Sequence, residues 1–287
     1  MLAFFGRLQS IDRRVIYLVM FVAAAISLIV PVTLPVIPSN QALNAFEAIE
    51  KAPTDKYALI GADWSNSTRA ENGAQTYALM HHLMRRHIKF AIVGFDVQGP
   101  PNVEQIVKEL APKYGYEYGR DWVDWGFHPY NAIKATLKAM VRDMPGSMKH
   151  DINNTDLTDT VKLPIMAGLK NMDQVGLIVE ITPADTYESW VAFVQGYGGG
   201  KPMVHAPTAV MAPEAYQFLD SGQMVGMLTG LKGAIEYEGM VKQPGRATKQ
   251  ALALSVAHVL ILLLIVLGNL GYIAQKRKPQ TRLEDQP

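Results

Sequence analysis

Three acidic residues lie at or just after the ends of apolar runs typical of buried strands. Asp63 follows YALIGA, Asp96 follows FAIVGF, and Glu180 lies in VGLIVEI. In a parallel sheet, ligands bind beyond the carboxyl ends of the strands. We therefore expect Asp63, Asp96 and Glu180 to converge on one polar rim.

Neighbouring polar side chains extend this predicted rim. The full candidate set is Asp63, Trp64, Ser65, Asn66, Asp96, Glu180 and Asp185. The set could form a pocket for a polar ligand, and two adjacent carboxyls could serve as acid and base in a hydrolase. Alternatively, the same residues cap helices and complete turns. The sequence leaves these interpretations open.

Composition excludes several other kinds of chemistry. The 287 residues include no Cys, which rules out disulfides, Cys zinc sites, iron–sulfur clusters and thiol nucleophiles. The formal net charge of +1 argues against nucleic-acid binding. The sequence has no phosphate loop, no GxGxxG after the first predicted strand, and no GxSxG or HExxH motif. We expect no cofactor.

One predicted helix carries three histidines. His81, His82 and His87 lie in the predicted helix 72–87, but their spacing places no pair one helical turn apart. Arg85 and Arg86 lie between them and would repel a cation. We therefore predict a solvated basic helix face and no metal site.

Two uncharged apolar segments are long enough to cross a membrane. They predict transmembrane helices at 15–37 and 251–273, with 38–250 as the domain between them. The remaining parts are short terminal segments, 1–14 and 274–287. The first segment exceeds the apolar part of a signal peptide, which favours an uncleaved anchor.

Basic residues are concentrated in the short ends of the chain. They are Arg7, Arg13, Arg14, Lys276, Arg277, Lys278 and Arg282. Cytoplasmic segments next to membrane spans carry such an excess. We therefore expect an integral membrane protein with both termini in the cytoplasm and an extracytoplasmic domain.

The domain alternates apolar runs with helical segments. Expected strands are 57–62, 90–95, 116–127, 175–181 and 202–210, and the polar stretch 149–161 is expected to be a surface loop. Continuous apolar strands between helices are typical of a parallel sheet covered on both faces. The prediction is a doubly wound α/β domain with a mainly parallel sheet of about five strands, flanked by one transmembrane helix at each end.

A glycine-rich stretch and a histidine in the second span are candidate contact sites. Residues 221–238 predict a helix with Gly222, Gly226, Gly230 and Gly233 on one side. That side could meet a second subunit or the domain's own sheet, or the glycines could break the helix into turns. His258 lies inside the predicted second span. It either contacts a partner or stands as a neutral imidazole near the membrane interface without a partner.

These features predict a non-enzymatic protein that presents its α/β domain for ligand or partner binding. We expect it to work as a subunit of a larger membrane assembly, with other membrane subunits or copies of itself as partners. The alternative is a membrane-anchored hydrolase that uses Asp63, Asp96 or Glu180.

Overall fold

The computed structural model describes residues 12–29, 36–196 and 199–276. The chain divides into two compact units. One unit is the domain, residues 35–248, and the other comprises the terminal segments 1–34 and 249–287.

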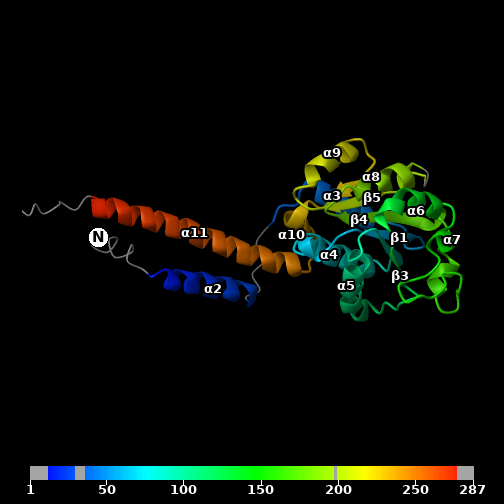
Figure 1. The fold of residues 1–287 in the computed structure, drawn as a ribbon, viewed down its shortest axis with the longest axis horizontal. Coiled ribbons are helices and arrows are strands. Elements are labelled where there is room, and N and C mark those ends of the chain that lie inside the picture. Colours follow the sequence, from blue (N-terminus) through cyan, green and yellow to red (C-terminus); the bar gives the residue numbers. More distant parts are fainter. Residues whose placement is uncertain (1–11, 30–35, 197–198, 277–287) are drawn as a thin grey trace, which may run out of the picture. The chain divides into compact units, whose positions relative to one another are not determined.

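Six strands form one parallel sheet in the domain (Figure 1). They are β1 (Tyr57–Ala62), β2 (Phe90–Gly94), β3 (Trp122–Phe127), β4 (Val175–Thr182), β5 (Met203–Pro207) and β6 (Gly226–Met227). Their order is β3-β2-β1-β4-β5-β6, and every neighbouring pair is parallel. In this order the chain reverses direction across the sheet between β1 and β4, where ligand sites of doubly wound folds lie.

Helices cover both faces of the sheet. One apolar layer includes residues of α3 (Asn40–Glu50), α4 (Asn72–Arg85), α5 (Gly99–Tyr114) and α10 (Gly230–Met240). The other includes residues of α6 (Ile133–Met140), α7 (Met144–Met148), α8 (Thr186–Ser189), a π-helix (Trp190–Gln195) and α9 (Ala212–Asp220). Short 3₁₀ turns occupy Asn66–Thr68, Tyr130–Ala132, Pro164–Ala167 and Met172–Gln174.

The apolar strands explain this two-sided arrangement. In β1, Ile60 belongs to one buried layer and Leu59 to the other. In β4, Val179 and Ile178 divide in the same way. Because successive strand side chains point to opposite faces, a continuous apolar run requires helices on both sides. The predicted α/β class and parallel sheet are confirmed, with six strands instead of about five.

The described residues of the terminal unit include two helices, α2 (Arg13–Ile29) and α11 (Arg246–Lys276), the latter beginning in the domain. Among the described residues, one helical stretch, Arg246–Ile273, is long and apolar enough to cross a membrane. It includes the predicted second span. The predicted first span is helical up to Ile29, and its residues 30–35 lie outside the described part of the chain.

The prediction of one helix over 221–238 is wrong. Gly222 lies in a turn with a φ of +76°, and Gly226 lies in strand β6. Gly230 begins α10 with a φ of +54°, and Gly233 lies within that helix. The left-handed φ values at Gly222 and Gly230 are incompatible with one continuous helix. The glycines therefore break the segment into a turn, a short strand and a helix.

The close neighbours of two of these glycines belong to the domain itself. A Cβ atom on Gly226 would lie 2.2 Å from the backbone nitrogen of Ala45 in α3. One on Gly233 would lie 2.6 Å from the carbonyl carbon of Leu228. The absence of a side chain at Gly226 lets β6 pack directly against α3.

Candidate functional site

The carboxyl groups of Asp63 and Glu180 meet at the carboxyl ends of β1 and β4. Glu180 is in register with Gly61 of β1, and Asp63 follows β1. A Cβ atom on Gly61 would lie 1.6 Å from Glu180 Oε2, so the carboxyl occupies the space that glycine leaves. There it lies next to the Asp63 carboxyl, and Asp63 Oδ2 and Glu180 Oε2 have no hydrogen-bond partner among the described residues. Asp63 is 3% exposed and Glu180 is fully buried.

Hydrogen bonds fix each carboxyl. Asp63 Oδ1 accepts from the backbone N–H of Phe95, directly after β2. The Thr186 hydroxyl donates to Glu180 Oε1 over 2.8 Å. The pair therefore links the ends of three strands to the segment 186–195, which contains α8 and the π-helix.

Burial determines the protonation of this pair. It raises the pKa of Asp63 to about 6 and the pKa of Glu180 well above its ordinary value, and the charge of Asp63 raises the Glu180 pKa further. Within the described residues, neither carboxyl forms an ion pair with a Lys or Arg. At neutral pH the pair therefore retains a proton.

Asp96, the third predicted rim carboxyl, makes a different contact. Its Oδ1 accepts from the backbone N–H of Gln98 over 2.8 Å, in a local turn before α5. Asp96 is partly exposed, unlike the buried pair. A short Asp side chain is well placed for such a turn, which keeps it on its own loop.

The residues after Asp63 also make local contacts. Trp64 is fully buried in the apolar layer of α4 and α5. The Ser65 hydroxyl lies 2.7 Å from that of Ser67. The backbone N–H of Asn66 donates to the side chain of Gln98 over 3.1 Å. These contacts hold the loop and do not involve the carboxyl pair.

Beside the pair, a cavity of about 360 Å³ opens between the segments that follow β3 and β4. We call it the carboxyl-edge pocket. Its lining residues are Tyr130, Asn131, Ile133, Lys134, Asp185, Glu188 and Ser189. The Tyr130 hydroxyl donates to Asp185 Oδ1 over 2.8 Å and joins the two walls. Of the predicted rim residues, Asp185 is the one that lines this cavity.

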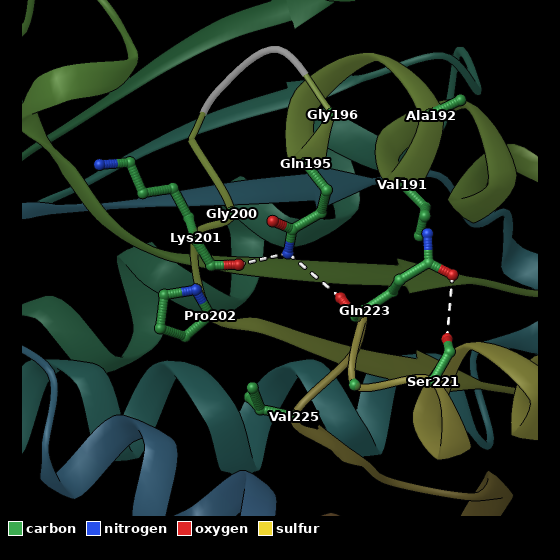
Figure 2. Close-up of a pocket in the computed structure, with 11 residues that line it drawn as sticks. Val191, Ala192, Gln195, Gly196, Gly200, Lys201, Pro202, Ser221, Gln223 and Val225 are labelled. Atoms are coloured by element: carbon green, nitrogen blue, oxygen red, sulfur yellow. Dashed lines mark hydrogen bonds between the residues drawn. The ribbon is translucent and has the colours of Figure 1, made fainter.

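A second cavity, of about 440 Å³, lies at the opposite edge of the sheet (Figure 2). We call it the amino-edge pocket, because Pro202 and Val225 lie just before β5 and β6. The Gln195 side-chain nitrogen bonds to the carbonyls of Lys201 and Gln223. The Lys201 amino group points away from this contact (Figure 2), so the pocket presents amide groups without a directed charge.

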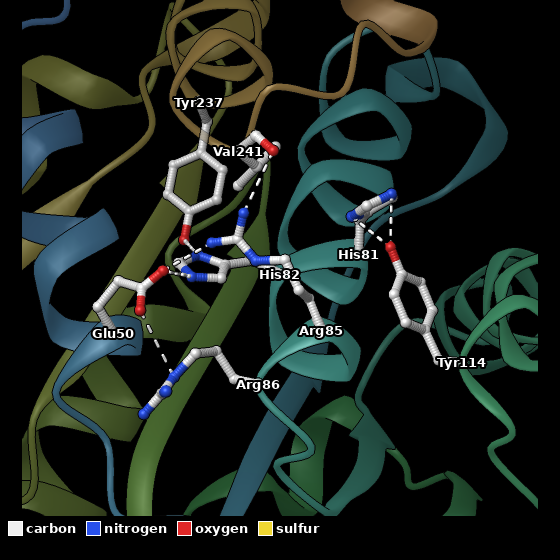
Figure 3. Close-up of polar contacts among 8 residues, drawn as sticks. All are labelled: Glu50, His81, His82, Arg85, Arg86, Tyr114, Tyr237 and Val241. Carbon is white, nitrogen blue, oxygen red and sulfur yellow. Dashed lines mark hydrogen bonds and ion pairs between the residues drawn. The ribbon is translucent and has the colours of Figure 1, made fainter.

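The predicted solvated histidine face is wrong for His81 and His82, which are 2% and 0% exposed. His82 Nε2 lies 2.9 Å from Glu50 Oε1, and its Nδ1 lies 2.6 Å from the Tyr237 hydroxyl (Figure 3). His81 lies against the Tyr114 hydroxyl. The helix packs against α5 and α10, and His82 reaches Glu50 at the end of α3, so both histidines are covered although arginines follow them.

The hydrogen bonds of His82 connect helices and therefore have a structural role. Burial lowers the pKa of His82 to about 4, so the ring is neutral at pH 7. A neutral ring satisfies both neighbours if Nε2–H donates to Glu50 and Nδ1 accepts from Tyr237. Arg85 and Arg86 also pair with Glu50. The cluster thereby joins α3, α4 and α10.

Sequence reasoning missed three buried residues around the carboxyl pair. Thr186 and Trp190 contact it directly, and His205 of β5 is in register with Glu180. Burial lowers the pKa of His205 to about 3, and its Nδ1 lies 3.3 Å from the Glu180 carbonyl oxygen. A histidine inside the apolar run PMVHAPTAV was the available signal for a buried polar group.

Other candidates stand apart from this site. His258 lies in α11 with an exposed side chain, and its partner contact stays a prediction. In the described ranges, no three His, Asp or Glu side chains are grouped so that they could hold a metal ion.

Comparisons with protein-family models, with curated proteins and with solved structures give no match.

Proposed function

We propose that this chain is a two-span membrane protein that presents its α/β domain outside the cytoplasm to bind a polar ligand or a partner protein. In this proposal it is a non-catalytic subunit of a larger membrane assembly, with both termini in the cytoplasm. The partners are other membrane-protein subunits or further copies of the chain.

The carboxyl-edge pocket carries the proposal. It lies beyond the carboxyl ends of β3 and β4, on the side of the sheet where doubly wound folds bind ligands. Its volume of about 360 Å³ suits a small molecule or a few side chains of a partner. Asp185, Glu188 and Lys134 offer charges of both signs, and Tyr130 and Asn131 offer hydrogen bonds.

Ligand binding is tested by thermal unfolding of the full chain in mild detergent with a panel of small polar molecules. A ligand of the carboxyl-edge pocket should raise the melting temperature of the wild type but not of Asp185→Asn. Ser221→Ala in the amino-edge pocket is the matched control and should respond like wild type. If the rise in melting temperature is lost in Ser221→Ala and kept in Asp185→Asn, the ligand binds in the amino-edge pocket and the proposal is contradicted.

Topology is tested with reporter fusions. A reporter after Pro287 should be active only in the cytoplasm, and one inserted in the loop 149–161 only outside it. That segment has no helix or strand and tolerates insertion better than the sheet. An exported reporter after Pro287 would overturn the two-span arrangement.

A membrane-anchored hydrolase is the second candidate, favoured by the convergence of Asp63 and Glu180. Two carboxyls with separated pKa values can serve as acid and base. Their burial argues against direct contact with a substrate, since they are 3% and 0% exposed. Hydrolysis of ester or phosphate substrates by the wild type, lost in both Asp63→Asn and Glu180→Gln, would support this alternative.

A further inference from the structure

The segment 186–195 covers the carboxyl pair. At its start, the Thr186 hydroxyl donates to Glu180. Four residues later, the Trp190 ring lies beside the Glu180 carboxyl above Gly61. The pair therefore contacts this segment at two points, one in α8 and one at the start of the π-helix.

The same stretch of chain forms one wall of the carboxyl-edge pocket. Asp185 and Glu188 line that pocket, and they flank Thr186, which contacts Glu180. The opposite wall is joined to Asp185 through Tyr130. Movement of α8 away from the sheet would therefore change the shape of the pocket.

The contact between Asp63 and Glu180 requires a proton. Ionised carboxylates only accept hydrogen bonds, so two of them can bond to each other only if one oxygen carries hydrogen. Asp63 Oδ2 and Glu180 Oε2 are both buried and have no hydrogen-bond partner among the described residues. One proton between the two carboxyls satisfies both groups.

Among the described residues, no Lys or Arg forms an ion pair with Asp63 or Glu180 that would replace this proton, and the cation of the adjoining α6, Lys134, lines the carboxyl-edge pocket. From β5, His205 faces the pair as a neutral ring, because burial lowers its pKa to about 3. From α8 and the residues beside it come Asp185 and Glu188, which are acidic, and the uncharged Tyr187. From the segment after β3 comes the Tyr130 hydroxyl, which bonds to Asp185.

We propose that Asp63 and Glu180 form a proton-dependent latch that holds segment 186–195 against the sheet and keeps the carboxyl-edge pocket in its present shape. Loss of the shared proton to water leaves two adjacent carboxylates, whose repulsion is strong in a buried site. The repulsion releases α8 and the π-helix and opens the pocket wall. The link to the pocket rests on the proposed function, whereas the latch itself does not.

Hydrogen exchange of the full chain in detergent tests the release. Backbone protection of residues 186–195, corrected for intrinsic exchange, should fall about tenfold per pH unit once opening requires loss of one proton. Glu180→Gln and Asp63→Asn carry an amide that donates without titrating, so protection should become independent of pH. Asp96→Asn is the matched control and should keep the wild-type dependence, because the Asp96 side chain accepts its hydrogen bond from Gln98 in its own loop.

Infrared spectroscopy on the same samples reads the proton directly. Above pH 8, where Asp124 with its pKa of about 7 is ionised, wild type and Asp96→Asn should show a protonated carboxyl band that is absent in Glu180→Gln. A wild type without that band, or with protection that does not change with pH, would overturn the latch. So would a pH-dependent loss of protection that persists in both pair variants. These measurements need no ligand, so an empty pocket would refute the proposed function alone.

Discussion

The Asp63–Glu180 pair and the partly exposed Glu50 differ in what surrounds the carboxyl groups. At the carboxyl edge, Asp63 meets Glu180 with no cation in contact. On the other face of the sheet, Glu50 meets His82 and two arginines (Figure 3). Burial would raise the pKa of Glu50, but the hydrogen bond to His82 and the charges of His82 and the arginines lower it. In contrast, the pKa values of Asp63 and Glu180 are both raised.

The difference shows that neighbouring charges decide whether a carboxyl group keeps its charge or its proton. A carboxylate that is paired with arginines keeps its charge and joins helices over a wide pH range. A sealed pair of carboxyls is stable only while it holds a proton. The His82 cluster is therefore expected to be structural, whereas the Asp63–Glu180 pair is expected to respond to pH.

The largest expected effect comes from filling the space above β1. Gly61→Ala places a Cβ where Glu180 Oε2 lies and 3.0 Å from the Trp190 ring. Overpacking of this kind costs about 1–3 kcal/mol of unfolding free energy. Gly73→Ala in α4 is the matched control, since its closest neighbour would be Arg69 Cγ at 3.2 Å and alanine favours a helix. Equal melting temperatures for the two variants would contradict the close packing of the pair.

A smaller loss is expected in the charge-balanced cluster. Tyr237→Phe removes the hydroxyl that donates to His82 and leaves a buried ring nitrogen without a partner. The expected cost is about 1–2 kcal/mol of unfolding free energy, with the same difference from wild type at pH 7 and pH 9. Chemical unfolding in detergent measures it, and Tyr216→Phe on the exposed part of α9 is the control. A cost that grows toward pH 9 would show that this cluster also titrates.

The smallest effect is expected at the carboxyl that makes only a local contact. Asp96→Asn keeps an oxygen for the Gln98 backbone N–H and should change the unfolding free energy by less than about 0.5 kcal/mol. Thermal unfolding at pH 5 and pH 8 checks this. A larger change that depends on pH would place Asp96 with the pair after all.

Much of the sheet was predictable because its strands are continuous apolar runs between helices. The two-residue strand β6 was not predictable, because Gly226 lies in a stretch whose apolar spacing also suits a helix. The meeting of Asp63 and Glu180 followed from their positions at strand ends. The position of the Asp96 side chain could not be predicted in this way, because an Asp at the end of a strand can face the sheet or bond within its own turn. The burial of His82 depends on α3 and α10, which are distant in sequence.

The central claim is that Asp63 and Glu180 share a proton in the folded protein. A raised folded-state pKa means that the folded state binds more protons than the unfolded one, so stability falls as pH rises. The lowered pKa values of His81, His82 and His205 act in the opposite direction but only below about pH 6.5. Asp124, whose pKa burial raises to about 7, contributes little above pH 8.

The most direct test is therefore the unfolding free energy of the full chain in detergent between pH 8 and pH 9. Wild type should lose up to about 1.4 kcal/mol per pH unit more than Glu180→Gln, which is the effect of one bound proton. If wild type and Glu180→Gln have the same slope in this range, the folded pair holds no proton there and the account is contradicted.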